Sequence, residues 1–372
     1  MFEKILVVAN SGRMLARSAL YIGLKPIVID VFSDEDTRNL AYDFCQIPTL
    51  SLDYLIPAVE AFLSRHNVSH FIYGSGFEGH HDSLAYLNER LKVIGNQVKT
   101  FITAQQKVTL FQVLDRFNIP YPLVSFTQPQ VDDLWLIKPL FSYGGVGIKR
   151  YLPGDEVNEL YYWQRYQEGT LHSVLFLADG INAQVVGFNT QWARSADRDS
   201  EFIFCGIINS CELESTNKQT VFDWVKKLTI EFGLVGLNSL DFIHSKGQNY
   251  FLEINPRLPA SMQLYGSNLL NNHISACQGV LEYNPIKNLV CRAYQVIYIE
   301  DDIFVPQFID WPTYVVDVPA VGVLIRKGQP ICSIIVHENN PQLVFAELAD
   351  KQQQLITNLK GPNQDGIQRK PQ

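Results

Sequence analysis

Continuous apolar runs alternate with helix-like segments through the first hundred residues of the chain. The run KILVVA at 4–9 precedes a helix-like segment at 14–24, and a second apolar run, PIVIDVF, occupies 26–32. Continuous apolar runs are typical of strands buried on both faces, so this order predicts a parallel sheet. The amphipathic segment 53–66 and a third strand entering a glycine-rich loop at 71–79 extend the pattern. We expect an α/β domain over residues 1–98.

Farther along the chain, a β-hairpin is predicted because two strand-like runs flank the turn sequence SKG at 245–247. Asp241 lies on the first strand and Glu253 on the second. Side-chain alternation puts Phe251, Glu253 and Asn255 on one face of the second strand. Carboxylate and amide oxygens are the ligands that Mg²⁺ prefers, so Asp241, Glu253 and Asn255 form a candidate metal site. The alternative is an edge hairpin whose acids are only solvated.

A lysine and a glycine-rich turn separate two further strand-like runs. Lys138 ends the first run, and SYGGVG follows at 142–147. Glycines in such a turn let backbone N–H groups approach phosphate oxygens, and the lysine supplies positive charge. The Walker pattern, in which GK[ST] opens a helix, is not met.

Two helices are predicted from their apolar spacing, one over 99–117 and one over 220–233. Lys107 lies in the first half of the first helix and, taken alone, is an ordinary surface lysine. Residues 288–360 are interpreted as several strands with Gly-Gln-Pro turns, which predicts a small β-rich subdomain without an attached swinging cofactor. The polar tail 361–372 is expected to be disordered.

Composition narrows the class of protein. The 372 residues are 47% hydrophobic and 12% aromatic, which is enough for two or three packed domains. A net charge of −8 without a Lys/Arg run argues against a nucleic-acid or anionic membrane surface. No apolar run approaches the ~20 residues of a membrane span, and the start lacks signal-peptide character, so a cytoplasmic protein is expected. Six cysteines without a C-x-x-C pair favour reduced thiols.

Two other sites in the N-terminal domain are weaker hypotheses. Asp30 ends the second strand about where a dinucleotide-binding acid would sit, but the preceding loop holds one glycine, which disfavours NAD. His80, His81 and Asp82 are residue types that bind metals. Adjacent histidines usually point in different directions, however, and no fourth ligand is evident, so a solvated loop is expected. Glu78 in the same loop lies at the carboxyl ends of the strands and could contact a polar substrate.

Taken in order, these motifs resemble the ATP-grasp superfamily over about residues 1–285. The motifs that carry the resemblance are Lys107, Lys138-Pro139 before Gly144-Gly145-Val146-Gly147, the strand end YWQRYQEG, Asp241, and Glu253-Ile254-Asn255-Pro256-Arg257. The resemblance implies an ATP-grasp domain over 99–287, with a small lobe at about 122–168, in which two α+β lobes grip ATP. The expected fold class is therefore α/β and α+β, with a parallel-sheet domain before the ATP-grasp fold and a β-rich extension after it.

The resemblance also assigns roles to the phosphate-side residues. Lys107 and Lys138 would contact the nucleotide phosphates. The loop that would close over the phosphates consists of Gly144, Gly145, Val146 and Gly147.

On the base side, Tyr166 and Gln167 fall in the inter-lobe segment whose backbone reads the adenine edge in the family. Gln164 stands where family members often carry Glu, and His172 falls where the ribose hydroxyls are bound. Phe251 would pack against the nucleotide beside the metal ligands.

The remaining roles concern catalysis. Asp241, Glu253 and Asn255 would hold one or two Mg²⁺ ions, and Arg257 would face the transferred phosphoryl group or its acyl acceptor. Lys138 and Arg257 would stabilise the charge that develops, so positioning and electrostatics rather than a protein nucleophile would do the chemistry.

The expected activity is an ATP-dependent ligase that joins a carboxylate to an amine through an acyl phosphate. The chain looks closest to ligases of coenzyme biosynthesis, such as the tyramine-glutamate ligases of methanofuran biosynthesis. A small-molecule kinase on the same fold and a non-catalytic ATP sensor are the alternatives. Glu78, His80 and His81 are candidates for the base that deprotonates the amine, by loop position.

The sequence leaves the two substrates unidentified. Plausible contacts to small-molecule carboxylate and amine substrates are Arg194, Arg257, Ser261, Gln263 and Tyr265. A homodimer through the N-terminal domain is left open.

Overall fold

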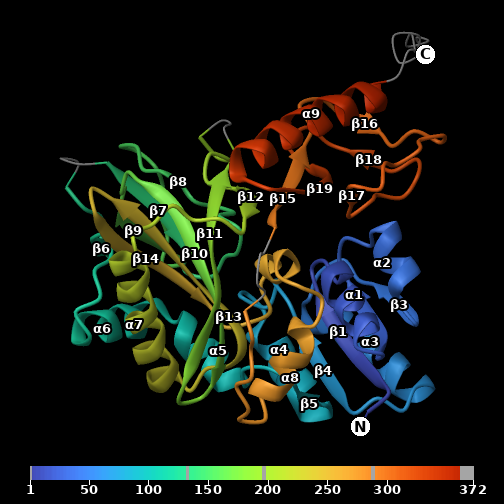
Figure 1. The fold of residues 1–372 in the computed structure, drawn as a ribbon, viewed down its shortest axis with the longest axis horizontal. Coiled ribbons are helices and arrows are strands. Elements are labelled where there is room, and N and C mark those ends of the chain that lie inside the picture. The colour runs from blue at the N-terminus through green and yellow to red at the C-terminus, as the bar shows by residue number, and fades with distance from the viewer. Residues whose placement is uncertain (1, 131–133, 195–197, 286–289, 361–372) are drawn as a thin grey trace.

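The computed structural model describes residues 2–130, 134–194, 198–285 and 290–360, and the predicted tail at 361–372 lies outside them. Its N-terminal part is a parallel sheet in the order β3-β2-β1-β4-β5, with helices between the strands (Figure 1). The elements are β1 Lys4–Ala9, α1 Arg13–Tyr21, β2 Lys25–Asp30, α2 Glu35–Leu40, β3 Asp43–Gln46, α3 Leu52–Arg65, β4 His70–Tyr73, α4 His81–Arg90 and β5 Lys92–Val93. The central strands β1 and β2 are buried along nearly their whole length, as their continuous apolar runs predict.

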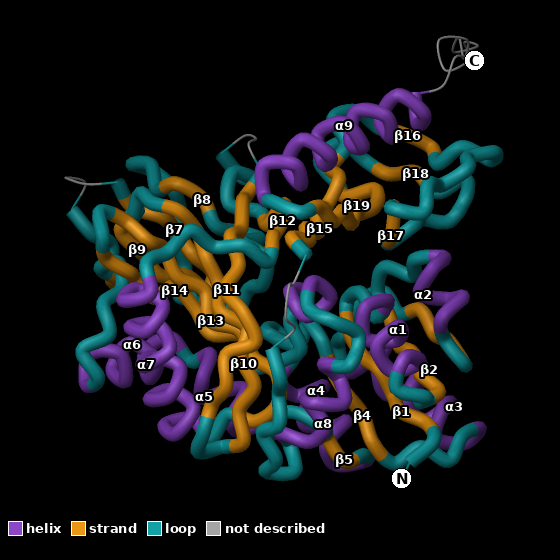
Figure 2. The backbone as a smooth tube through the Cα atoms, in the orientation of Figure 1, coloured by secondary structure: helices purple, strands orange, loops and turns teal. Residues whose placement is uncertain are grey.

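A long antiparallel sheet forms the middle of the molecule (Figure 2). Its order across the described residues is β14 Gln248–Asn255, β13 Val235–Ser245, β10 Thr170–Asp179, β11 Ala183–Ala193, β12 Phe204–Ile208, β15 Cys291–Tyr298, β19 Pro330–Glu338 and β17 Val315–Val316. One face packs on α7, Ser215–Phe232, whose buried side chains share a core with Phe242 and Phe251. The other face packs toward the N-terminal sheet through η1 Ala260–Leu264 and α8 Leu269–Ala276.

A smaller antiparallel sheet lies beside this one. Its strands, in the order β6-β9-β7-β8, are β6 Val124–Ser125, β9 Tyr161–Arg165, β7 Trp135–Pro139 and β8 Lys149–Arg150. Two helices, α5 Val98–Gln105 and α6 Lys107–Arg116, connect it to the N-terminal sheet. The predicted combination of a parallel N-terminal sheet with a two-lobed α+β region is confirmed.

The predicted β-rich C-terminal region is continuous with the long sheet, and it includes one helix that was not predicted. β15 pairs with β12, so residues after 290 extend the same sheet that carries the hairpin. The β-rich prediction also missed α9, Pro341–Lys360, which covers this end of the sheet (Figure 1). Its signal was present, because Val344 and Leu348 are four apart, as are Leu355 and Leu359, and all four are buried. The short strands β16 Ile303–Phe304 and β18 Leu324–Ile325 form a separate pair.

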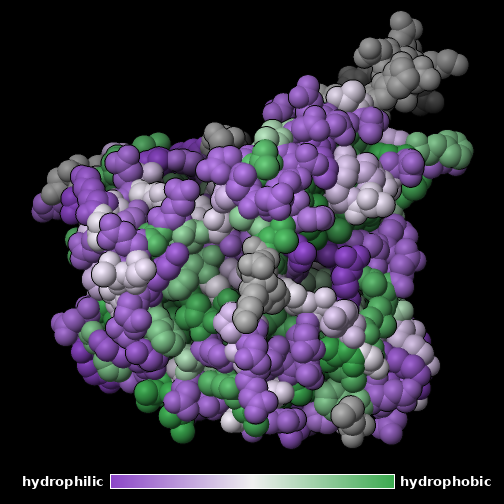
Figure 3. Space-filling view, in the orientation of Figure 1, coloured by the Kyte–Doolittle hydropathy of each residue, from purple (hydrophilic) through white to green (hydrophobic). Residues whose placement is uncertain are grey.

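The surface near β16 and β18 is partly apolar. Phe304 is 62% exposed and Phe308 is 92% exposed, and green residues project at this end of the molecule in Figure 3. Among the described helices, none combines the length and apolarity needed to cross a membrane. All six cysteines are unpaired.

Candidate functional site

The predicted metal ligands meet across the β13–β14 hairpin. Asp241 and Glu253 are direct cross-strand partners, and the turn residues Lys246 and Gly247 both have positive φ, as a tight hairpin turn requires. The Asn255 amide lies 3.3 Å from an Asp241 oxygen and 3.4 Å from a Glu253 oxygen. The structure therefore brings all three predicted ligands together.

Phe251 does not share their face, contrary to the alternation expected from the sequence. The pairing shifts between Asp241 and Phe242, so Glu253 pairs with Asp241 while Phe251 pairs with Phe242. Leu252 is the extra residue of this β-bulge, which turns Phe251 to the opposite face. Phe251 is fully buried in the core beneath α7. Its predicted place beside the metal ligands is wrong, because a bulge breaks the two-residue period.

The single helix expected over 99–117 is two helices. Gln106 is extended, with φ −65° and ψ 105°, and Lys107 is the first residue of α6. Lys107 is not an ordinary surface lysine, because burial lowers its pKa while the carboxylates of Glu253 and Glu78 act to raise it. The break at Gln106 thus delivers Lys107 to the carboxylates.

Lys138 approaches the same carboxylates from the small sheet. It stands opposite Tyr162 on β9, and its Nζ donates a 3.0 Å hydrogen bond to Gln164 Oε1. Burial lowers the pKa of Lys138 to about 8. The nearby carboxylate of Glu253 acts to raise this pKa, whereas the positive charge of Lys107 acts to lower it. Two lysines from different elements therefore converge on Glu253.

The two carboxylates carry their charge unequally. Burial and the nearby charge of Glu253 raise the pKa of Asp241 well above its ordinary value. Burial opposes the ionisation of Glu253 as well, but Lys107 and Lys138 outweigh it, and the pKa of Glu253 is lowered. A divalent cation bound between the two carboxyl groups would favour the ionised form of Asp241.

This donor set fits Mg²⁺. It consists of two carboxylates and one amide, and Gln191 donates a 3.1 Å hydrogen bond that holds Asp241. The Asn255 amide now directs Nδ2 to the carboxylates and Oδ1 to Arg257, so it would turn over to present its oxygen to a metal. In the part of the chain described, no group of three or more His, Cys, Asp or Glu residues is placed to hold a metal, so the candidate site rests on two carboxylates and one amide.

The glycine-rich turn has the backbone conformation that glycine alone adopts easily. Gly144, Gly145 and Gly147 have φ of 59°, 76° and 78°. A Cβ on Gly145 would lie 1.9 Å from the Phe202 carbonyl oxygen, and the Phe204 N–H donates a 2.9 Å bond to Gly144. The loop is thus packed against the segment before β12. The part of Val146 in covering a nucleotide stays a prediction.

The predicted adenine segment lies at the end of β9. The Tyr166 backbone N–H donates a 2.7 Å hydrogen bond to the Leu134 carbonyl oxygen. The Arg150 guanidinium lies over the Tyr166 ring, 4.5 Å from its centroid. Gln167 donates to the neighbouring Glu168 carbonyl. Gln164 is 2% exposed, and its Nε2 has no hydrogen-bond partner in the described structure. An orphaned amide in this position fits a nucleotide base as partner.

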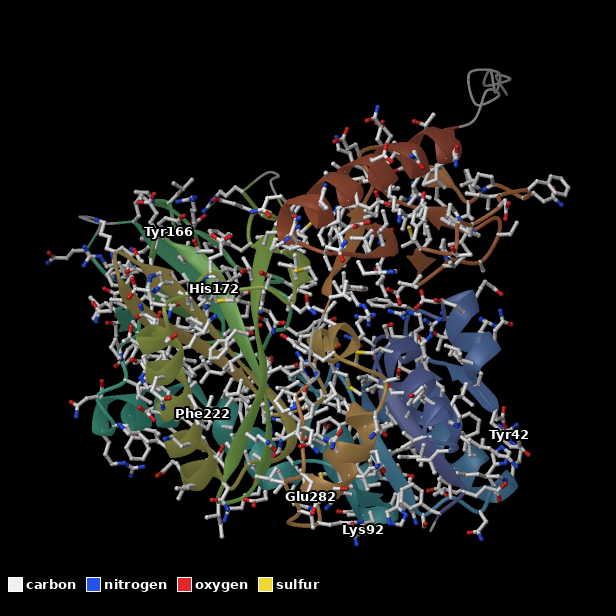
Figure 4. All side chains as sticks on the ribbon, viewed as in Figure 1. Tyr42, Lys92, Tyr166, His172, Phe222 and Glu282 are labelled. Carbon is white, nitrogen blue, oxygen red and sulfur yellow. The ribbon has the colours of Figure 1, made fainter. Side chains whose placement is uncertain are left out.

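His172 does not join the metal ligands. It pairs with Phe242, with the ring centroids 5.5 Å apart, whereas its neighbour Ser173 pairs with Asp241. Figure 4 labels both residues: His172 is on β10 of the long sheet, whereas Tyr166 follows β9 of the smaller sheet. Burial lowers the pKa of His172 to about 4, and Nδ1 lies 3.3 Å from Cys211 Sγ. Its ribose role stays a prediction that this geometry disfavours.

Arg257 is held by Glu78 from the N-terminal domain. Its Nε donates a 2.7 Å bond to Glu78, and its Nη2 lies 3.2 Å from Asn255 Oδ1. Glu78 is 2% exposed and holds Arg257 through this ion pair, and its role as a base or substrate contact stays a prediction. His81 is not a solvated loop residue either, because its ring packs edge-on against Phe141 and burial lowers its pKa.

Several of these side chains border one small cleft. The space in it is about 10 Å³, room for about one water molecule. The residues that line it are Glu78, Gln105, Lys107, Leu140, Phe141, Ser142, Glu253, Ile254 and Asn255. Cationic, carboxylate and amide groups thus meet at one concave place, as a site for phosphate and metal requires.

The other predicted substrate contacts are spread out. Arg194 donates to the Gly328 carbonyl and stacks on Tyr298, and Tyr265 is buried with its hydroxyl on Asn189. Gln263 accepts a bond from Arg13 on α1. Ser261 is 3% exposed, and its hydroxyl has no partner in the described structure. Sequence reasoning missed Gln191 and Gln105, for which no motif provides a signal.

Comparisons with known proteins agree with this geometry. The family model for the ATP-grasp domain matches residues 104–261. The carbamoyl phosphate synthase large chain of Clostridium perfringens is 22% identical, over 43% of this chain and 17% of its own length. The chain therefore spans about a sixth of the length of such curated relatives.

Two solved structures share the fold. The biotin carboxylase domain dimer of 2-oxoglutarate carboxylase from Hydrogenobacter thermophilus, in complex with MgADP, ADP and bicarbonate, has a TM-score of 0.72 at 16% identity, covering 94% of this chain and 89% of that one. The N5-carboxyaminoimidazole synthetase of Staphylococcus aureus, complexed with ADP, has a TM-score of 0.68 at 16% identity, covering 94% and 97%.

Proposed function

Because this chain carries an ATP-grasp domain, we propose that it is an ATP-dependent ligase that joins a carboxylate to an amine and releases ADP and phosphate. The observation that carries the proposal is the convergence of Lys107 and Lys138 on the Asp241–Glu253 pair, with Arg257 beside Asn255. Cationic donors and oxygen ligands for a metal at one cleft are the groups that phosphoryl transfer needs.

The charges of these residues determine what each would contribute. Attaching a phosphoryl group turns a carboxylate into an acyl phosphate, which an amine can attack. Negative charge then accumulates on phosphate oxygens, and Lys107 and Lys138 would neutralise it from two sides. Mg²⁺, held by Asp241, Glu253 and Asn255, would supply further charge neutralisation.

Arg257 would face the acyl acceptor, since Glu78 and Asn255 fix its guanidinium beside the candidate metal ligands. The glycine loop would exclude water from the phosphates, because Gly144 and Gly145 are packed against residues before β12. Water exclusion matters because an acyl phosphate is hydrolysed when water competes with the amine.

The test is a screen of acid and amine pairs for ADP release, with mass detection of the conjugate. The resemblance to ligases of coenzyme biosynthesis makes glutamate with tyramine the first pair. Lys138→Ala and Glu253→Ala should abolish ADP formation while circular dichroism and melting stay native-like. Lys226→Ala provides a matched control, because Lys226 is an exposed lysine on α7 paired with Asp223. Normal turnover in the first two variants would disprove the proposal.

The oligomeric state belongs to the same proposal. The Hydrogenobacter domain is described as a dimer, and that supports testing this chain for a homodimer. Sedimentation of the full chain with and without Mg·ADP measures it directly.

A further inference from the structure

Gln105 is a buried amide whose oxygen lacks a partner. It is the last residue of α5, 8% exposed, and no described residue donates a hydrogen bond to its Oε1. Buried polar atoms in folded proteins are nearly always paired, with protein, with water or with a ligand. Gln105 Oε1 therefore needs a hydrogen-bond donor or a cation that the described residues do not supply.

The helix break next to Gln105 directs it to the cleft. Gln106 is extended between α5 and α6, so Gln105 and Lys107 end one helix and begin the next. Both residues line the same small cleft together with Glu253 and Asn255. Gln105 therefore stands among the groups that the proposed function assigns to phosphate and metal.

The chemistry of an amide oxygen limits its partner. Oε1 is a hydrogen-bond acceptor, and ATP phosphate oxygens at neutral pH are acceptors too, so the nucleotide phosphates alone leave Oε1 unpaired. The partner must be a cation or a group that carries hydrogen. A water bound to a divalent metal ion is such a group, and Mg²⁺ keeps several waters when it binds carboxylates and phosphates.

We propose that Gln105 is a positioning residue of the metal site, whose Oε1 accepts a hydrogen bond from water on the divalent cation that Asp241, Glu253 and Asn255 hold. The inference rests on the proposed function and adds a residue that its motifs do not include. Outer ligands of this kind orient the metal, and removing one typically costs about 10- to 100-fold in metal affinity.

The experiment measures metal affinity rather than turnover. Full-length protein is saturated with ADP, and Mn²⁺ is titrated as a spectroscopic substitute for Mg²⁺ while electron paramagnetic resonance reports free Mn²⁺. Gln105→Ala should weaken Mn²⁺ binding about tenfold or more, and Gln105→Glu, which keeps an acceptor oxygen, should restore it. Gln112→Ala, a change of an exposed amide on α6, should bind Mn²⁺ like the wild type.

Metal-free controls separate this role from its rivals. With EDTA, Gln105→Ala should bind ADP as the wild type does. An equal loss of ADP affinity with and without metal, unchanged Mn²⁺ binding in Gln105→Ala, or further weakening in Gln105→Glu would each overturn the inference. If wild-type protein itself shows no metal-dependent ADP binding, the proposed function fails instead, so the two failures are distinguishable.

Discussion

Glu78 accepts a 2.7 Å hydrogen bond from Arg257, although 179 residues separate them along the chain. The other oxygen of Glu78 accepts the Gly76 N–H at 2.7 Å, so the carboxylate is fixed at both ends. The two side chains are 2% and 10% exposed. The N-terminal parallel sheet thus sets the position of an arginine that belongs to the nucleotide-side hairpin, and the two regions must be assembled for the site to exist.

Replacing Glu78 with Gln should therefore impair catalysis more than nucleotide binding. The substitution leaves the Arg257 charge without its buried partner, and breaking such a pair costs about 3 kcal/mol of stability. With the substrate pair found in the screen, ADP formation should fall about 100-fold, because Arg257 no longer holds its orientation. The Kd of Mg·ADP, measured by calorimetry, should change less than about threefold, a smaller effect than the loss of turnover.

Glu60→Gln is the matched control for this variant. Glu60 pairs with Arg90 at 2.8 Å, but both side chains are about half exposed, so its loss should cost less than about 1 kcal/mol and leave turnover intact. Native turnover in Glu78→Gln would contradict the positioning role of Glu78.

Asp241→Asn should make the metal-free protein more stable. A carboxyl whose folded pKa is raised keeps its proton longer than in the unfolded chain, so wild-type stability falls as pH rises above the ordinary value of 3.8. The amide removes this loss, and we expect about 1 kcal/mol of stabilisation at pH 7. Melting with and without Mg·ADP measures both effects.

The variant should also lose most of the extra stability that Mg·ADP gives the wild type, because Asp241→Asn removes a negatively charged oxygen ligand of Mg²⁺. A metal-free Asp241→Asn protein that melts below the wild type would show that Asp241 is not a strained carboxyl. Asp223→Asn, an exposed change on α7, controls for the substitution itself.

The elements that sequence could predict are those set by local pattern. The apolar runs at 4–9 and 26–32 gave parallel strands, and the turn at 245–247 gave the hairpin that pairs Asp241 with Glu253. Spacing within one hairpin is local, so the register of the metal ligands follows from a few residues.

The parts that failed depend on partners far away or on a broken period. The bulge at Leu252 turns Phe251 to the strand face opposite Glu253, and no residue type in YFLEIN predicts a bulge there. The Glu78 contact joins two domains, which no spacing rule can foresee. Apolar spacing over 99–117 predicted one helix that contains Lys107, yet the chain is extended at Gln106, between the end of α5 at Gln105 and the start of α6 at Lys107.

Gly145→Ala should weaken nucleotide binding by displacing the glycine loop. Gly145 has φ 76°, and a methyl group there would lie 1.9 Å from the Phe202 carbonyl oxygen, so the loop or the facing backbone must move. We expect the Kd of Mg·ADP to rise about tenfold, which corresponds to about 1.4 kcal/mol of binding free energy. Calorimetric titration measures the change.

Gly154→Ala separates the clash from backbone strain. Gly154 also has positive φ, at 97°, but a Cβ there meets nothing within 4 Å. Its alanine variant should lose stability of about 1 kcal/mol and bind Mg·ADP normally. Equal effects of the two variants on the Kd would mean that the loop position does not matter for the nucleotide.

Raising the pH should weaken nucleotide binding through Lys138. Burial lowers its pKa to about 8 from the ordinary 10.5, so in the free protein the ammonium loses its proton as pH rises through 8. Phosphate binding requires the charged form, so the Kd of ADP should rise above pH 8 by at most about tenfold per pH unit.

Lys138→Arg tests the assignment, because a guanidinium stays charged throughout this range. Its Kd for ADP should stay flat to pH 10. Without nucleotide the sign reverses: a lysine with a lowered folded pKa binds fewer protons folded than unfolded, so its contribution to the free energy of unfolding grows between pH 8 and 10.5. The wild type should gain stability relative to Lys138→Arg over that interval while losing ADP affinity. A wild-type Kd that is independent of pH would assign the titrating group elsewhere.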